Sequence, residues 1–327
     1  MVAARYCGHP CCPRVTERDD DVRTVELTDS GRLDAVLAGA LPDCSRSRLS
    51  RWIREGRVQI DGVAATRASQ PVRAGMQVRI EWPPPAPPVT GTPVPFTVLY
   101  EDDAILVIDK PAGLIVHPGD LNETGTLVHG LLHRYPELAN AFGDADPRRP
   151  GIVHRLDRGT SGVMVVARTE IARQKLATAF AERQVNKRYF AWVYGTAPES
   201  GTWDQPIGRH PRDRKRFAVV AAGKPAVSHF RRRWMRDGVS AIEVAIETGR
   251  THQIRVHAAA ARLPLLGDPV YGARAKPPAA FRDWAGSRNR PALHAHRLTF
   301  AHPVSGERVT FDAPLPDDLA ELDARGC

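Results

Sequence analysis

The chain has 327 residues, enough for two domains, of which at least one has a sizeable core. Its 46 Lys and Arg residues outnumber its 37 Asp and Glu residues, and the resulting charge of +9, supplied mostly by arginine, favours a polyanionic partner. Five cysteines form no disulfide framework in a chain of this length, and no segment approaches the ~18 apolar residues of a membrane span or resembles a signal peptide. We therefore expect a cytoplasmic protein without a membrane anchor.

The first residues are charged and rich in arginine, and we expect them to form a disordered leader over residues 1–23. Cys7, His9, Cys11 and Cys12 lie close together there and are residue types that bind zinc. No second pair of ligands follows at a familiar spacing. We therefore expect no metal site.

A small separate domain is predicted after the leader. Apolar residues at helical spacing indicate a helix over residues 33–40, and a second helix runs from Ser45, a plausible N-cap, to Gly56. Residues 58–63 read as a hairpin around an Asp-Gly turn, and residues 76–80 alternate as a closing strand.

The second helix carries a stripe of basic residues. Arg48, Arg51 and Arg54 recur every three residues, and Arg46 extends the stripe. Only Glu55 interleaves with these cations, so we expect them to have few local partners. They suit the phosphates of a polyanionic partner, whose neutralisation gives affinity with little reading of sequence. The alternative is an ordinary solvated helix face.

A proline run begins after Trp82 and predicts a semi-rigid polyproline II spacer, an interpretation we prefer to a proline-recognition motif. The spacer divides the chain. The predicted parts are a leader (1–23), a small domain with the basic stripe (24–82), a linker (83–93) and a larger domain (94–327).

The larger domain has more strands than helices, which favours an α+β fold with a mainly antiparallel sheet. The predicted strands are residues 97–100, 105–108, 163–167, 189–194, 241–246 and 297–300. The predicted helices are residues 126–134, residues 169–183, and a third that Thr251 caps.

The most informative segment of the chain is residues 151–162. Asp157 lies between Arg155 and Arg158, and a Gly-Thr-Ser-Gly turn and a buried strand follow it. A carboxylate on a tight turn between cations stays ionised and exposed, as a carboxylate nucleophile must. The alternative is a structural aspartate in an arginine-paired turn.

Three further segments carry candidate site residues. Residues 110–118 (KPAGLIVHP) turn sharply, and we interpret them as a structural turn that shapes a cleft. Tyr189 lies in an aromatic strand, where a core role is the alternative to a site role. Arg255 lies one turn into the third helix, in the segment ETGRTHQIRVH. The roles of Arg250 and His252 stay open, and the spacing of His252 and His257 argues against zinc.

These motifs together resemble the RluA/RluD family of RNA pseudouridine synthases, and the helical module resembles the S4 RNA-binding domain. The resemblance implies a bent mixed sheet with a central cleft. It also implies that Asp157 is the nucleophile and that Arg255 pairs with it, which would orient the carboxylate bidentately. Tyr189 would stack on an extruded uracil, with its hydroxyl as base or hydrogen-bond partner, and Arg155 would hold the vacated stack open.

The RluD branch combines both domains and modifies uridines in helix 69 of 23S rRNA. We therefore expect a monomeric enzyme that converts uridine to pseudouridine without a cofactor or metal. Its expected partner is 23S rRNA, free or in the assembling large ribosomal subunit, and another rRNA or tRNA site is an alternative target. The rival functions are a non-catalytic ribosome-assembly factor and a carboxylate glycosidase, which normally needs a second acid.

Overall fold

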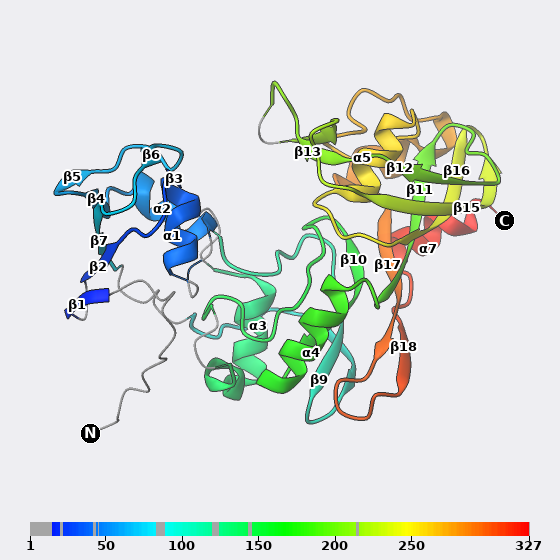
Figure 1. Cartoon of the computed structure of the whole chain (residues 1–327). Coiled ribbons are helices and arrows are strands. Elements are labelled where there is room, and N and C mark those ends of the chain that lie inside the picture. Colours follow the sequence, from blue (N-terminus) through cyan, green and yellow to red (C-terminus); the bar gives the residue numbers. More distant parts are fainter. Residues whose placement is uncertain are drawn as a thin grey trace. The chain divides into compact units, whose positions relative to one another are not determined.

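The computed structural model describes residues 15–19, 22–41, 44, 46–82, 89–119, 124–142, 146–213 and 216–326. The chain divides into two compact units, one up to residue 86 and one from residue 87 (Figure 1). This division falls inside the predicted linker. The proline run at 83–88, the cysteine cluster and Ser45 lie outside the described residues.

The first unit packs two helices against a five-stranded sheet. The sheet order is β1-β2-β7-β4-β5, and its strands are β1 (Val15–Asp19), β2 (Val22–Glu26), β4 (Val58–Ile60), β5 (Val63–Ala64) and β7 (Gln77–Glu81). Strands β3 (Gly31–Arg32) and β6 (Pro71–Val72) form a separate pair. Helices α1 (Leu33–Ala40) and α2 (Arg46–Arg54) bury their apolar faces against this sheet, with Leu37, Leu49 and Trp52 fully buried.

The predicted hairpin forms, and its backbone shows why. Asp61 and Gly62 both have positive φ, at 47° and 83°. Positive φ at both central residues is the type I′ geometry that joins twisted antiparallel strands, and Asp-Gly is a favoured sequence for it.

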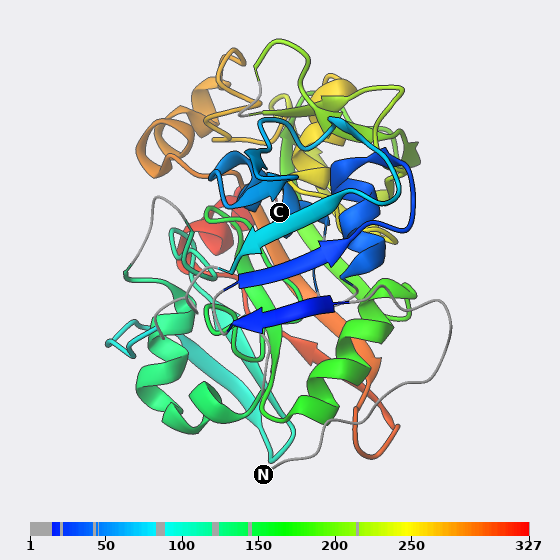
Figure 2. The same cartoon turned by 60° about the vertical axis from the view of Figure 1, so that its left-hand side comes forward.

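The described part of the expected leader corrects the sequence analysis. Residues 15–19 form strand β1, which pairs with β2 in antiparallel register and extends the sheet (Figure 2). The ordered unit thus begins before residue 24. Without β1, one edge of β2 would present unpaired N–H and C=O groups, and this pairing satisfies them.

The second unit is built on a nine-stranded mixed sheet, as predicted for an α+β fold. Its order is β12-β15-β16-β11-β17-β10-β9-β8, and β18 also pairs with β17. The strands are β8 (Thr97–Glu101), β9 (Ile105–Lys110), β10 (Ser161–Ala167), β11 (Asn186–Tyr194), β12 (Ser200–Asp204), β15 (Val227–Arg236), β16 (Val239–Ile246), β17 (Leu293–Ala301) and β18 (Arg308–Asp312). A small hairpin of β13 (Ile207–Arg209) and β14 (Phe217–Val219) stands beside it.

Helices cover the sheet and complete two cores. They are α3 (Leu127–Arg134), α4 (Glu170–Ala181), α5 (Gln253–Ala260), α6 (Arg282–Arg288) and α7 (Asp317–Ala324), with short 3-10 helices η1 (Pro136–Asn140) and η2 (Ala279–Phe281). The larger core includes α3, α4 and strands β9 and β10, and a second core lies under α6 and α7. The predicted helices and strands all form, with ends shifted by a few residues.

Strand β17 joins the two halves of the sheet, and one residue of it lies at the junction. Ala295 pairs with Gly162 of β10 on one side and with Tyr189 of β11 on the other. Among the described strand pairs of this sheet, β10 with β17 is the parallel one. This register brings the turn that carries Asp157 next to Tyr189.

Gly162 is required for that close approach. Its φ is +120°, and a Cβ atom there would lie 2.2 Å from the carbonyl oxygen of Ala295. Gly162→Ala is therefore expected to lower the free energy of unfolding by about 2–4 kcal/mol, from backbone strain and overpacking together. Urea unfolding measures this change.

Gly286→Ala in α6 is the matched control, because a Cβ there meets no atom within 4 Å. That variant should gain up to about 1 kcal/mol from helix propensity. Equal effects of the two substitutions would show that β10 does not need a glycine at the junction.

Candidate active site

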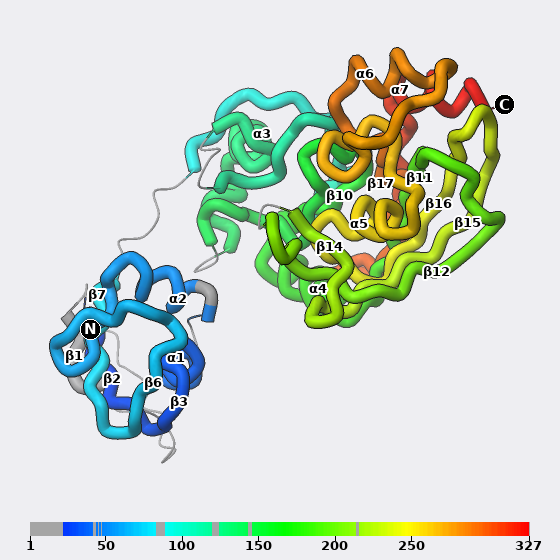
Figure 3. The backbone as a smooth tube through the Cα atoms, turned by 90° about the horizontal axis from the view of Figure 1, so that it is seen from above, coloured from blue at the N-terminus to red at the C-terminus, as the bar shows by residue number. Residues whose placement is uncertain are grey.

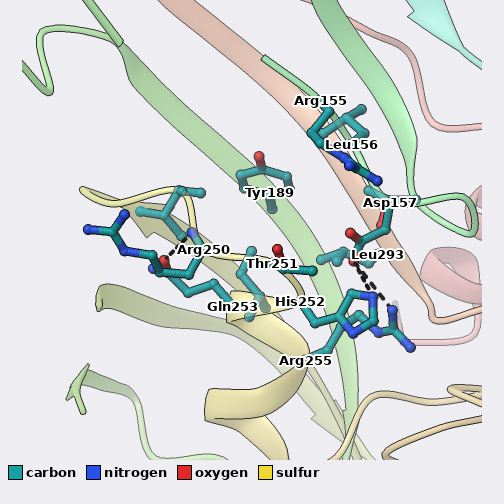
Figure 4. Close-up of a pocket in the computed structure, with 14 residues that line it drawn as sticks. Arg155, Leu156, Asp157, Tyr189, Arg250, Thr251, His252, Gln253, Arg255 and Leu293 are labelled. Atoms are coloured by element: carbon teal, nitrogen blue, oxygen red, sulfur yellow. Dashed lines mark hydrogen bonds and ion pairs between the residues drawn. The ribbon is translucent and has the colours of Figure 1, made fainter. Parts of the chain in front are cut away.

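A pocket of about 120 Å³ lies where β11, the N-terminal end of α5 and the turn before β10 meet (Figure 4). Asp157, Tyr189, Arg255 and Arg155 all line it, so the fold brings the four candidate residues of this domain together. His252 and Arg255 converge on the carboxylate of Asp157 in the close-up. Apolar lining residues complete the wall: Leu156, Ile246, Ile254 and Leu293.

Asp157 is carried on a turn that hydrogen bonds hold in place. The N–H of Thr160 donates to the carbonyl of Asp157 at 3.1 Å. The N–H of Gly113 donates to the carbonyl of Arg158 at 2.7 Å, and Arg158 Nε donates back to the carbonyl of Gly113 at 3.2 Å. The predicted KPAG turn thus contacts the turn that carries Asp157 directly.

Lys110 braces the same two loops from inside. Its side chain is fully buried, and Nζ donates to the carbonyls of Pro111 and Leu114 at 2.8 and 2.9 Å, with Arg158 O at 3.5 Å. Burial, together with the charge of Arg290, lowers the pKa of Lys110 to about 7. This lysine therefore shapes the cleft, as the sequence analysis expected.

The carboxylate of Asp157 lies against one guanidinium. Arg255 Nη1 donates to Asp157 Oδ2 at 3.3 Å. The bidentate partner of Arg255 is instead Asp268, at 2.7 and 2.9 Å. The expectation of a bidentate pair with Asp157 was therefore wrong, because Nε and Nη2 of Arg255 already donate to Asp268.

The buried Asp268 holds the guanidinium of Arg255 in position. Its side chain has no exposed surface, and the amides of Val270 and Tyr271 also donate to it. Burial opposes its ionisation, but the hydrogen bonds and charge of Arg255 prevail, and the pKa of Asp268 is lowered. Arg255 is thereby held in one position before any substrate arrives.

The arginines beside Asp157 do not pair with it. Among the described residues, the ion-pair partners of Asp157 are Arg255 and, at 3.9 Å, His252. Arg158 turns to the carbonyl of Gly113, and Arg155 is an exposed residue at the pocket. The cation that contacts the carboxylate therefore comes from α5 and not from the residues that flank Asp157 in the sequence.

His252, left open by the sequence, belongs to the site. Its Nδ1 lies 2.9 Å from the hydroxyl of Tyr271, and its Nε2 faces Asp157. Burial lowers the pKa of His252, which favours the neutral ring. When Tyr271 donates to Nδ1, the ring proton is on Nε2 and points toward the carboxylate.

The start of α5 differs from the prediction. His252, in the left-handed region at φ 58°, precedes the helix, and Thr251 does not cap it. The side chain of Gln253 accepts hydrogen bonds from the N–H of Arg250 and the hydroxyl of Thr248 instead. This left-handed turn, in place of an ordinary threonine cap, directs the His252 side chain into the pocket.

Tyr189 is nearly buried, with 9% of its surface exposed. Burial and the charge of Asp157 raise its pKa well above the usual value. The hydroxyl therefore stays protonated, which favours stacking and hydrogen-bond donation over a role as base. The buried hydroxyl of Thr160, also at the pocket, makes no hydrogen bond within the described chain.

No metal site is found among the described residues, which contain no group of three or more His, Cys, Asp or Glu side chains suited to hold an ion. His257 is structural: its ring is buried between the hydroxyl of Ser228 and the carbonyl of Gln205. Within the same described part of the chain, no helix is long and apolar enough to cross a membrane.

The basic stripe on α2 is exposed but has partners that the sequence analysis did not expect. Arg46 pairs with Asp34 of α1 at 2.9 Å, and Arg51 lies 3.7 Å from Glu55. Arg48 lies over the ring of Trp52, and Arg54 donates to a backbone carbonyl. Packing of α1 on α2 supplies Asp34, which is distant in sequence.

Sequence reasoning gave no role to Asp268 and Tyr271, although both lie in the segment GDPVYG. The signal that could have found them is an aspartate directly before proline in an otherwise apolar segment, since a buried carboxylate needs a partner. The identity of that partner, Arg255, depends on the tertiary fold.

Comparison with family models matches residues 104–260 to RNA pseudouridylate synthase and residues 31–78 to the S4 domain. The chain is 48% identical over 315 residues to "Ribosomal large subunit pseudouridine synthase D" of Xanthomonas campestris, covering 93% of this chain and 92% of the relative. The protein of that name from Escherichia coli K12 is 42% identical, with 89% of each chain covered. The solved structure of human RNA Pseudouridylate Synthase Domain Containing 4 is 26% identical with a TM-score of 0.56, covering 70% of this chain and 92% of that one.

Replacing Asp268 tests how much its ion pair with Arg255 contributes to stability. Asp268→Asn is expected to destabilise the protein by about 3 kcal/mol at pH 7, because a buried guanidinium loses its charged partner. Since the pKa of Asp268 is lowered on folding, its contribution is complete above the unfolded value of about 4 and is lost as pH falls through the folded value. The difference in the free energy of unfolding between wild type and Asp268→Asn should therefore become smaller at acidic pH.

Urea unfolding from pH 7 to pH 3 measures this gap, with the exposed Asp237→Asn as control. Asp237 has φ 48° in a turn, a conformation that asparagine also tolerates. A gap independent of pH would contradict a lowered pKa at Asp268.

Proposed function

We propose, since the chain belongs to the RluA/RluD family of RNA pseudouridine synthases, that it isomerises uridine to pseudouridine in 23S rRNA with Asp157 as the nucleophile. The observation that carries this proposal is the placement of the Asp157 carboxylate. The carboxylate is partly exposed at the pocket and contacts the guanidinium of Arg255, which Asp268 holds in position.

The reaction exchanges one glycosidic bond for another. The C1′–N1 bond of uridine breaks, the uracil turns, a C1′–C5 bond forms, and the proton on C5 is replaced by one on N1. Reactant and product have the same atoms, so no redox partner or group donor is needed. Asp157 supplies the nucleophile to the sugar or ring, and Arg255 orients its carboxylate.

The target base must leave the RNA stack before Asp157 reaches it, which costs a few kcal/mol and least in loops. Arg155, exposed at the pocket, is proposed to fill the vacated stack. The pocket volume of about 120 Å³ is smaller than the ~300 Å³ at which ligand sites usually begin. Movement of Arg155 out of the pocket would enlarge it for the flipped uridine.

Tyr189 is proposed to stack on the flipped uracil. Its ring lines the pocket beside Asp157, and its raised pKa leaves the hydroxyl as a donor. Aromatic stacking on an extruded base contributes to binding of every base, so hydrogen bonds must supply the selection of uracil.

The target we propose is helix 69 of 23S rRNA, reached by a monomer in the cytoplasm, as free rRNA or in the assembling large subunit. The names of the relatives support a large-subunit target. The S4 domain supports RNA binding, and the exposed arginines of α2 (Arg46, Arg48, Arg51 and Arg54) are proposed to contact phosphates.

A test of activity and target uses Asp157→Ala. Its pseudouridine formation is expected to fall by about 10⁴-fold or more, the scale of removing a catalytic group. Mapping of rRNA by carbodiimide primer extension should then show loss of stops in helix 69. A folded variant with an unchanged rRNA map would favour a non-catalytic assembly factor, and loss at other sites would overturn the target alone.

Substitutions of Tyr189 separate its ring from its hydroxyl. Tyr189→Phe should keep activity within about tenfold of wild type, because it keeps the stacking surface. Tyr189→Leu should lose a further ~5–150-fold in kcat/KM, the equivalent of a stack worth ~1–3 kcal/mol. Single-turnover assays on a helix 69 stem-loop measure both. Equal losses would assign the role of Tyr189 to its hydroxyl.

A further inference from the structure

A second and larger hollow adjoins the active pocket. Its volume is about 470 Å³, within the usual range of ligand sites. It shares Gly249, Arg250 and Thr251 with the active pocket, so the two are continuous along the loop before α5. We call it the hairpin groove, because residues of the β13–β14 hairpin line its other side. Figure 3 shows β14 next to α5.

Cations line the hairpin groove. Arg209 and Lys224 are exposed there and Arg250 is half-buried, while none of the groove's described lining residues is acidic. The charge in this groove is therefore suited to an anion. The sequence motifs assign no role to Arg209 and Lys224 and leave that of Arg250 open. The groove adjoins the pocket that is proposed to hold the flipped base.

Two of the three cations, Arg209 and Arg250, are held in position by contacts within the fold. The guanidinium of Arg209 lies 4.5 Å from the ring centroid of Phe217, a cation–π contact across the hairpin. Arg250 Nε donates to the carbonyl of Pro225 at 3.0 Å, next to Lys224. Ordering of these side chains before binding reduces the entropy lost when a ligand binds.

Glycines bring the backbone close at the floor of the groove. A Cβ atom on Gly223 would lie 2.6 Å from the backbone of Ile207, and the backbones of Ile207 and Lys224 exchange two hydrogen bonds of 2.9 Å. A Cβ on Gly249 would meet nothing within 4 Å. The space above Gly249 is thus open on the path between the two hollows.

The hairpin is also linked to the nucleophile. The N–H of Phe217 donates to the hydroxyl of Tyr271 at 3.1 Å, and the same hydroxyl lies 2.9 Å from Nδ1 of His252. His252 in turn faces Asp157. A ligand in the groove therefore contacts a strand that is hydrogen-bonded through Tyr271 to His252, whose Nε2 lies 3.9 Å from Oδ2 of Asp157.

We propose that the hairpin groove binds the phosphodiester backbone of the RNA strand that continues from the flipped uridine, with Arg209 and Lys224 as its phosphate contacts. The proposal rests on the proposed function, since it takes the nucleotide in the active pocket as the start of that strand. A single strand leaving this pocket carries one negative charge per nucleotide, and the adjoining groove presents cations without acids.

The test is a binding cycle between protein and RNA. A helix 69 stem-loop is made with single neutral methylphosphonate linkages, one at a time, on both sides of the target uridine. Binding is measured with Asp157→Asn as background, so that the RNA is not converted. Neutralising the phosphate that lies in the groove should weaken binding by at least about tenfold, the scale of one charge-assisted hydrogen bond.

The double variant Arg209→Ala/Lys224→Ala, in the same background, should be insensitive to that neutral linkage, because its partners are gone. It should also lower the slope of log K against log salt by about 0.7 for each lost contact. The matched control is Arg282→Ala/Arg288→Ala in α6, which removes the same charge from two exposed residues outside both hollows. The control should keep the response to the neutral linkage.

The proposal is overturned if no linkage near the uridine matters, or if the double variant responds to each linkage as wild type does. These outcomes are distinct from failure of the proposed function, which is absence of pseudouridine after incubation of the wild-type protein with the unmodified stem-loop. Both altered side chains are exposed, and Arg209→Lys/Lys224→Arg, which keeps the charge, should restore the response to the linkage.

Discussion

The site depends on one guanidinium. Arg255 is fixed bidentately by the buried Asp268, and this leaves Nη1 to contact Asp157. A buried charge is costly unless it is paired, so the Arg255–Asp268 pair has one low-energy arrangement. Asp157 can therefore remain partly exposed at the pocket, while its ion-pair partner Arg255 is held in place by Asp268.

The sheet supplies the second constraint. Because Ala295 pairs with both Gly162 and Tyr189, strand register sets the distance between the turn that carries Asp157 and the ring of Tyr189. A slip of one residue would turn Tyr189 away from the pocket, since side chains alternate between the faces of a strand. Loop contacts at Lys110 and Gly113 then adjust only the turn itself.

Charge is divided between two units of the chain. The first unit displays arginines on α2, of which Arg46 and Arg51 also have acidic neighbours. The second unit places three cations, and no acidic residue, among the described residues that line the hairpin groove beside the pocket. The phosphate contacts that we propose for both sets of cations would orient an RNA without reading its bases. The pocket and the structure of the RNA would then select the uridine.

The sequence by itself determined most of the helices and strands and indicated the candidate site residues. The Asp61-Gly62 hairpin, the α1 and α2 helices and the buried β10 strand follow from local patterns, and Asp157, Tyr189 and Arg255 stand in recognisable motifs. Local patterns report which face of an element is apolar, and short motifs report the chemistry of adjacent side chains.

Only the tertiary structure decided which charges meet. The bidentate pairing of Arg255 with Asp268, the pairing of Arg46 with Asp34 and the aim of His252 at Asp157 join residues from separate elements. The β1 strand likewise formed because β2 offered it an edge. Such contacts depend on strand register and helix packing, and no local pattern in the chain specifies a partner that folding brings from a distance.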